Sequence, residues 1–266
     1  MKTQGFSLLE LSIVLVIIGL LASGVMVGQS LVRGAELRSV MTDYSKILTS
    51  FNAFRGKYNA VPGDMKNATS YWGTAATCPP TLAAPLTTAA TCNGTGNGLL
   101  LYGEISAVQP EIFLVWHHLI NAGMFEGNLT GASGSATVAY VRPGINVPES
   151  RISGVGYNVV SWGNNLTNDP VLWAGGGSSV SVLIGSDNPA GYNTFPAFSA
   201  PDAYSIDVKM DNGKPGSGIF RSLKQTDCVV GVTATTSQTA AIYDLTKTTV
   251  ACSLIASLGG DPGTSN

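Results

Sequence analysis

A single carboxylate lies inside the most apolar segment of the chain. Phe6 to Val27 spans 22 residues and contains one charged side chain, Glu10. An α-helix rises 1.5 Å per residue, so about 20 apolar residues cross the hydrocarbon core of a bilayer. A carboxylate in that core costs roughly 2.5–3.5 kcal/mol on insertion scales, so it is a functional candidate by default. Glu10 is therefore the first candidate for a functional side chain.

The other residues with chemical potential form weaker patterns. His117 and His118 are the only histidines, and adjacent residues of a helix do not face the same way, so they make a poor metal pair. Asp207, Asp211 and Asn212 could supply oxygen ligands to Ca²⁺, but their spacing is not that of an EF-hand and favours a turn or capping role. No nucleotide-binding loop, serine-hydrolase elbow or zinc-protease motif occurs. We expect no enzyme activity, no catalytic residue, no resident metal and no cofactor, with calcium as the one open alternative.

Composition excludes two broad classes of protein. The chain has 266 residues with 14 Lys+Arg against 16 Asp+Glu, which gives a net charge of −2. A nucleic-acid-binding protein needs a basic footprint, so no nucleic-acid partner is expected. Hydrophobic residues reach 44% of the chain, which argues against wholesale disorder. The chain can therefore bury a core, and its length allows one or two domains.

Charge bias and cysteine content indicate that most of the chain lies outside the cytoplasm. Lys2 precedes the apolar segment, and basic residues favour the cytoplasmic end of a helix. Everything after Val27 then lies on the outer side, where disulfides form. No C-x-x-C pair occurs, and four cysteines allow three pairings, of which we favour the sequential one. The favoured bonds are Cys78–Cys92 and Cys228–Cys252, each worth about 3 kcal/mol through the loop it closes.

The segment from Lys2 to Leu11 (KTQGFSLLEL) resembles the class III signal of type IV pilins and type II secretion pseudopilins. The resemblance rests on a basic residue, a glycine, a phenylalanine, a glutamate after a short gap and an uninterrupted apolar run. It implies that prepilin peptidase removes residues 1–5 by cutting between Gly5 and Phe6. The same enzyme would methylate the new amine of Phe6, and Glu10 would be the assembly residue.

Electrostatics in the membrane supply a reason for such a glutamate. After cleavage, Phe6 carries a positive amine at the end of the helix, and Glu10 lies one helical turn further on. In a bundle of parallel helices, Glu10 of an incoming subunit meets the Phe6 amine of its neighbour. Pairing offsets the cost of two buried charges, whereas losing one partner leaves the other uncompensated. The pair is thus expected to set the axial register of the bundle.

The helix is expected to continue beyond the membrane. We assign residues 6–28 to a transmembrane helix and filament spine, and residues 29–55 to its amphipathic continuation. The 50 residues from Phe6 to Arg55 contain no proline and would span about 75 Å as one helix, similar to the spine of a pilin. Apolar side chains recur along the continuation at intervals of three and four residues. They are Leu37, Val40, Met41, Tyr44, Leu48 and Phe51.

Residues 56–266 are interpreted as a periplasmic or extracellular globular head of the α+β class. Residues 73–98 are expected to form a disulfide-closed surface loop, and the resemblance implies an antiparallel sheet packed on the long helix. Ser199 is a candidate N-cap and Gly123 a candidate C-cap. The expected elements are helices over 110–122 and 201–210, strands over 150–162, 180–184, 218–222 and 229–235, and a closing element over 248–258 for which we favour a helix.

The resemblance implies a structural role. The chain would be a subunit of a type IV pilus or a type II secretion pseudopilus, polymerised through its N-terminal helix. The alternative is a minor pilin at a filament tip, whose head acts as an adhesin or binding module. The implied partners are prepilin peptidase and other pilin or pseudopilin subunits. The chain would reside in the inner membrane as a single-pass protein before assembly, and in an extracellular pilus or periplasmic pseudopilus afterwards.

Overall fold

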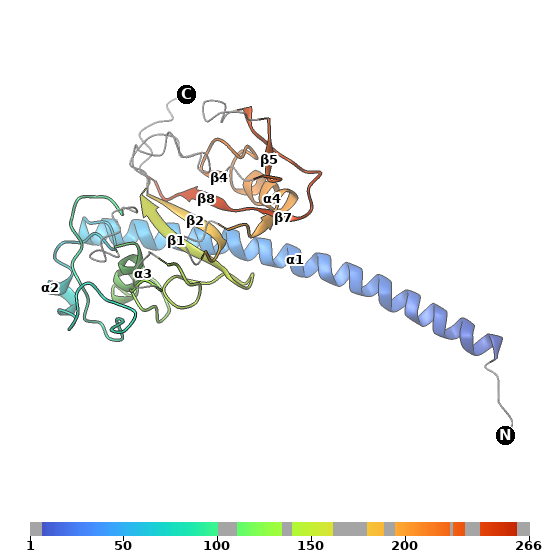
Figure 1. Cartoon of the computed structure of the whole chain (residues 1–266), viewed down its shortest axis with the longest axis horizontal. Coiled ribbons are helices and arrows are strands. Elements are labelled where there is room, and N and C mark those ends of the chain that lie inside the picture. Colours follow the sequence, from blue (N-terminus) through green and yellow to red (C-terminus); the bar gives the residue numbers. More distant parts are fainter. Residues whose placement is uncertain are drawn as a thin grey trace, which may run out of the picture.

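A computed structural model describes residues 7–100, 111–134, 140–161, 180–188, 195–223, 226–231 and 240–259. One long helix, α1 (Leu8–Tyr58), runs through the molecule. Its C-terminal half lies against the head, and its N-terminal half projects away as a rod (Figure 1). The expected combination of a long apolar helix with an α+β head and antiparallel sheet is therefore confirmed.

Helix α1 ends three residues later than expected. The expected end was residue 55, but the helix continues through Gly56 to Tyr58. The Tyr58 ring packs on Phe54 with ring centroids 4.5 Å apart, and this contact stabilises the extra turn. Asn59 then adopts the left-handed conformation (φ 47°) and its N–H donates to the Arg55 carbonyl, a typical C-terminal cap. The head thus begins after residue 59 and not at residue 56.

One face of α1 is buried against the head. Val40 and Phe51 are buried as expected, whereas Met41 and Leu48 lie at the edge and are only half-buried. Two neighbours that the sequence analysis left out, Ile47 and Phe54, belong to the centre of the face. The buried residues are Leu37, Val40, Tyr44, Ile47, Ser50, Phe51 and Phe54. Their spacing of three and four residues keeps them on one side of the helix.

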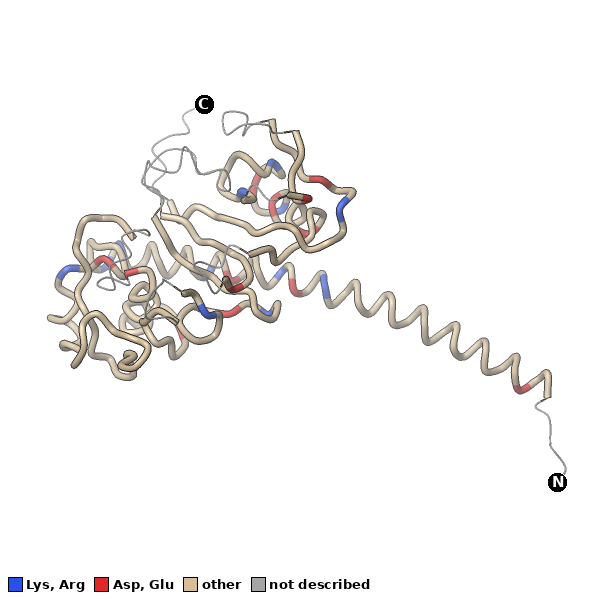
Figure 2. Tube along the Cα trace, in the orientation of Figure 1, with Lys and Arg blue, Asp and Glu red and all other residues tan. Residues whose placement is uncertain are grey.

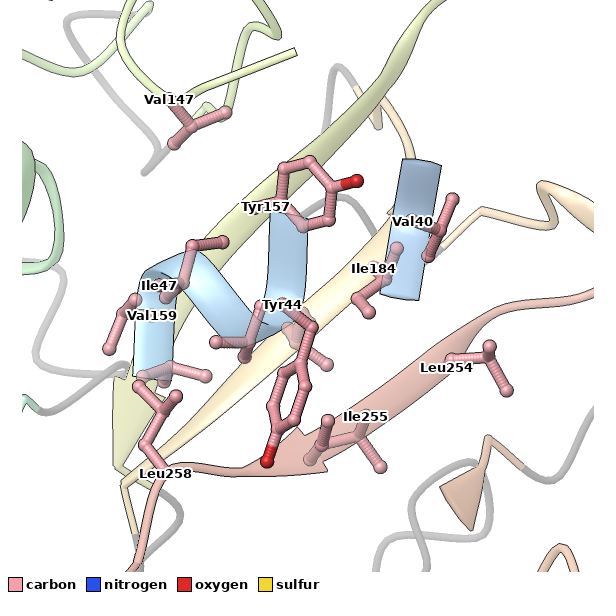
Figure 3. Close-up of a cluster of buried hydrophobic side chains, with 14 of the residues drawn as sticks. Val40, Tyr44, Ile47, Val147, Tyr157, Val159, Ile184, Leu254, Ile255 and Leu258 are labelled. Carbon is pink, nitrogen blue, oxygen red and sulfur yellow. The ribbon is translucent and has the colours of Figure 1, made fainter. Parts of the chain in front are cut away.

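A four-stranded antiparallel sheet covers this face. Its strands are β1 (Val155–Ser161), β2 (Val180–Ser186), β8 (Leu254–Ser257) and β4 (Phe220–Ser222), in the order β1-β2-β8-β4. Tyr157 pairs with Ile184, which pairs with Leu254, so these side chains share the face that meets α1. Figure 3 shows Tyr44 and Ile47 of α1 lying over this face. The Tyr44 hydroxyl also donates to the Ser257 carbonyl at 2.6 Å, which ties the helix to the end of the central strand β8.

The remaining elements complete the head around this helix–sheet core. Helix α3 (Glu111–Asn121) contacts α1 and β1, and helix α4 (Ala200–Met210) contacts α1 and β4. Both match expected helices, and Ser199 caps α4 as expected by accepting from the Asp202 N–H at 3.3 Å. The small elements are α2 (Thr69–Trp72), a pair of β3 (Phe198–Ser199) with β7 (Val250–Cys252), and a pair of β5 (Val229–Val230) with β6 (Ile242–Tyr243).

The expectation of a helical closing element is wrong. Residues 248–258 form two strands, β7 and β8, separated by Ser253. Strand β8 lies between β2 and β4, so both of its edges are paired. A short, continuously apolar run is ambiguous between a buried helix and a buried strand. The open position between two strands decided the outcome, because only an extended chain there satisfies the backbone groups on both sides.

The helix–sheet core predicts where truncation destabilises the head. Ile47 is 1% exposed, so Ile47→Ala leaves a cavity and lowers the free energy of unfolding by about 3 kcal/mol. Ile242 is 59% exposed, so Ile242→Ala is a matched control that changes it by less than about 0.5 kcal/mol. Urea unfolding of the detergent-solubilised chain, followed by circular dichroism, measures both. Equal losses in the two variants would contradict the assigned core.

Candidate functional site

The candidate assembly residue Glu10 lies in the first turn of α1 and closes a capping box. Its Oε2 accepts the Ser7 N–H at 2.9 Å, while the Ser7 hydroxyl accepts the Leu9 N–H at 3.3 Å. The two side chains thereby satisfy N–H groups that have no partner within the helix. The carboxylate is held at the positive end of the helix dipole, on the Ser7 N–H. Gly5 and Phe6 lie outside the described residues, so cleavage and methylation there stay predictions.

The N-terminal half of α1 presents a mostly apolar surface. Its large side chains, from Leu8 at 87% to Val32 at 61%, are at least half exposed. Figure 2 shows one acidic position near the N-terminal end of the helix and no further charge until the helix nears the head. By length and composition this segment is a candidate membrane span, and none of its apolar window is buried within the molecule. Such a surface needs lipid or other helices around it.

Comparison with known proteins identifies the segment around Glu10. Residues 1–26 match the family of the prokaryotic N-terminal methylation motif. The chain carries a prepilin-type signal. The match supports a pilin-like protein that is processed by prepilin peptidase and anchored in the membrane before assembly. The match covers residues 1–26, and no curated protein and no solved structure matches the chain.

An ion-pair cluster joins the prepilin-type helix to the head. The Arg33 guanidinium contacts the Asp202 carboxylate through Nη2 at 2.8 Å and Nε at 3.2 Å, and contacts Glu36 through Nη1 at 2.9 Å. Asp202 lies in the first turn of α4, where a negative charge is favoured. From Glu10 to Arg33 the helix rises about 35 Å, close to the thickness of a bilayer's hydrocarbon core. The head is therefore fixed to α1 just where the apolar span ends.

Sequence analysis did not find this junction. Asp202 lies 169 positions from Arg33 in the chain, so no local pattern relates the two residues. An acidic residue in the first turn of a helix is usually explained by the helix dipole alone. The contact of two Arg33 nitrogens with one oxygen of Asp202 depends on how α4 packs against α1, so no local signal could have predicted it.

Both disulfides have the sequential pairing favoured from the sequence. Cys78–Cys92 closes a loop of 14 residues and Cys228–Cys252 links the turn before β5 to β7. Cys228 and Cys252 are fully buried, whereas Cys78 is exposed at the surface of the 73–98 loop. The first bond therefore closes the expected surface loop, and the second lies within the core of the head.

The two histidines attach this loop to α3. The His118 Nδ1 accepts the Gly63 N–H at 2.9 Å, so its Nε2 carries the proton and donates to the Cys92 carbonyl at 3.2 Å. His117 contacts the Thr88 carbonyl through Nε2 at 3.0 Å. The two rings thus bind different parts of the loop, as expected for adjacent helical residues. Within the described part of the chain, no group of three or more His, Cys, Asp or Glu side chains is arranged to hold a metal.

Asp64, which the sequence analysis did not single out, organises the base of the same loop. The side chain is 2% exposed, and its Oδ1 accepts the N–H groups of Gly96 at 2.6 Å and Asn97 at 3.1 Å. Its Oδ2 accepts the Gly98 N–H at 2.7 Å. Several backbone donors on one carboxylate hold the loop in one conformation. The turn signal Pro62-Gly63 was the only hint in the sequence.

The candidate calcium ligands are used in turn hydrogen bonds. Asp207 Oδ1 accepts the Gly213 N–H and its Oδ2 accepts the Tyr243 hydroxyl, both at 2.9 Å. Asp211 Oδ2 accepts the N–H groups of residues 219 and 220, and Asn212 Oδ1 accepts that of residue 214. Burial raises the pKa of Asp207 to about 6. These side chains shape the turn after α4, which is the capping role that the spacing favours.

The His118 environment predicts an acid-sensitive loop. Burial lowers the His118 pKa from 6.5 to about 4. An unfolded loop therefore binds a proton that the folded one excludes, so stability is highest above pH 6.5 and falls as the pH drops toward 4. We expect the wild type to lose roughly 3 kcal/mol over this range relative to His118→Gln, which cannot titrate there. Thermal unfolding of both proteins across pH 4–7 measures the difference, and parallel pH profiles would contradict this assignment.

Proposed function

We propose that the chain is a structural subunit of a filament of the type IV pilus or type II secretion pseudopilus kind, assembled through α1. The observation that carries the proposal is the fully exposed apolar half of α1 with one carboxylate in its capped first turn, inside a segment that matches the methylation motif. A soluble monomer would not expose such a surface. Lipid covers it before assembly, and identical helices cover it in the polymer.

Cleavage at the N-terminus allows the helix to pass from lipid into the polymer. Cleavage after Gly5 frees an amine on Phe6, next to the point toward which the Glu10 carboxylate is directed. The carboxylate of one copy then pairs with the amine of a neighbour, which lowers the cost of both charges in an apolar bundle. The described helix has no other charge before Arg33, so this pair alone selects the axial position of each copy within the apolar segment.

Small residues allow the helices to approach one another. An added Cβ on Gly24 or Gly28 would meet nothing within 4 Å, so this side of α1 is open. The two glycines form a G-x-x-x-G pattern, which lets helix backbones pack closely in lipid. Neighbouring copies fit that space, and their packing replaces contacts with lipid.

The head projects from the filament axis and determines the outer surface. A pilus, a secretion pseudopilus and a tip-located adhesin share the same N-terminal chemistry, so they differ in where the polymer grows and how many copies it contains. Sheared surface material rich in this chain indicates a pilus. Loss of secreted proteins on deletion indicates a pseudopilus, and a few copies per filament indicate a tip subunit.

Replacing Glu10 by glutamine separates the effect of its charge from the effect of its capping hydrogen bond. Glu10→Gln retains the capping-box geometry, because glutamine also serves at this position, but removes the charge. We expect at least a roughly tenfold loss of sheared filaments, since losing the pair leaves the neighbour's amine uncompensated. Ser12→Ala is the control, because its hydroxyl bonds only to the Leu9 carbonyl of the same helix. Electron microscopy quantifies the filaments.

Mass spectrometry of the same filaments tests processing. The expected mature N-terminus is a methylated Phe6, in the wild type and in the Ser12→Ala control. Normal filament yield from Glu10→Gln would remove the charge pair from the proposal. An intact Met1 in the native protein, or a start beyond the apolar helix, would contradict the proposed function as a whole.

A further inference from the structure

A cleft lies beside α1, and none of the roles described above uses it. It encloses about 330 Å³ between α1 and two head segments, residues 125–129 and 144–149. Its apolar floor is formed by Ile47, Phe125 and Leu129. One wall of the cleft is formed by Asp43, Lys46 and Ile47 of α1, the helix through which parallel copies would pack.

Acidic side chains surround the cleft. Asp43, Glu126 and Glu149 line it against one basic residue, Lys46, so its formal charge is −2. The Asp43 carboxylate accepts the Tyr157 hydroxyl at 2.9 Å, and Glu149 accepts a backbone N–H at 2.9 Å. Glu126 is exposed and makes no hydrogen bond or ion pair with the described residues. A site with an apolar floor and an acidic rim suits a guanidinium, which is planar and weakly hydrated.

An unused arginine lies on the same helix. Arg38 is exposed and, within the described residues, forms no ion pair, in contrast to Arg33 in the junction with α4. It precedes Asp43 by five residues, which places it about 140° around the helix and about 7.5 Å closer to the membrane. Arg38 therefore faces away from the cleft of its own molecule. A contact between Arg38 of one copy and the cleft of the next is head-to-tail. In parallel copies it therefore repeats along the polymer.

The assembly register brings the two together. Pairing of Glu10 in one copy with the Phe6 amine of its neighbour shifts the two helices by four residues, or about 6 Å. The same shift sets Arg38 of the neighbour level with Thr42, one residue from Asp43. The residual offset of about 1.5 Å is far less than the reach of an arginine side chain. One register thus satisfies both the terminal pair and the cleft.

We propose that in the assembled polymer the Arg38 guanidinium of each copy enters the acidic cleft of the neighbouring copy and pairs with Glu126 and Asp43. The occupant of the cleft is thus a second copy of this chain. The contact rests on the proposed function and adds to it a second register lock, located at the level of the heads. Partial desolvation by Ile47 and Phe125 strengthens it relative to an exposed surface pair.

Charge reversal tests the contact. Arg38→Glu places a fourth acid against the cleft, and like charges across an interface cost several kcal/mol, so we expect at least a roughly tenfold loss of sheared filaments. Glu126→Arg alone is expected to cause a similar loss by repelling Arg38. The double variant Arg38→Glu with Glu126→Arg restores the attraction and recovers the filaments. Arg55→Glu is the matched control, because Arg55 is exposed on the same helix and lies far from the cleft level.

Cross-linking tests proximity directly. In filaments of the variant with Arg38→Cys and Glu126→Cys, mild oxidation is expected to give a ladder of covalent oligomers on a non-reducing gel. The pair Arg55→Cys and Glu126→Cys is expected to give none. Filaments at the wild-type level from Arg38→Glu, a double variant no better than either single one, or equal ladders from both cysteine pairs would each overturn the contact.

These outcomes are separable from those of the proposed function. Wild-type filaments with a methylated Phe6 and an Arg38→Glu variant that assembles normally would remove the Arg38 contact and leave the filament role intact. Failure of the wild type to polymerise would instead remove the role itself. Because Arg38 is exposed and distant from the buried face of α1, thermal unfolding of each variant is expected to match the wild type.

Discussion

The packing of one face of α1 against an antiparallel sheet is the interaction on which the molecule depends. Val40, Tyr44, Ile47 and Phe51 belong to the same buried cluster as the sheet, so one face of the helix is part of the core of the head. The same helix continues without interruption into a segment that has no contact with the head (Figure 1). A single rigid element thus transmits the position of the membrane-embedded end to the globular end, which is the mechanical requirement for a polymer subunit.

Carboxylates in this chain separate into two groups by their partners. Asp64 and Asp207 are buried and accept backbone or hydroxyl hydrogen bonds, which makes them determinants of loop conformation. Glu10 and Glu126 lie at surfaces that the monomer leaves uncovered. The first group is satisfied within one molecule. The carboxylates of the second group have at most one partner among the described residues. In the proposed polymer they can therefore pair with cations of neighbouring copies.

The loops of the head are held by polar contacts and a disulfide because they have few apolar side chains of their own. His118 connects residue 63 to Cys92, and the Cys78–Cys92 bond closes the loop in which Cys92 lies. These hydrogen bonds and the disulfide hold the loop in one conformation where few apolar side chains are buried.

The sequence alone determined the N-terminal signal, the long helix, its buried periodicity, helices α3 and α4, and strands β1, β2, β4 and β5. These features are local: a span of apolar residues, a three-and-four spacing, a cap or a turn residue specifies each of them within a short window. It also favoured the disulfide pairing that the structure contains, because neighbouring cysteines close small loops.

Only the tertiary structure decided that residues 250–257 are strands, that Arg33 joins Asp202, and that Asp43, Glu126 and Glu149 surround one cleft. Each of these outcomes depends on groups that are distant in the chain and meet only after the sheet has packed on α1. The free edge of a neighbouring strand overrides local preference, and a charge finds its partner by position in space. Long-range pairing of this kind leaves no periodic trace in the sequence, so it becomes visible only when the chain is folded.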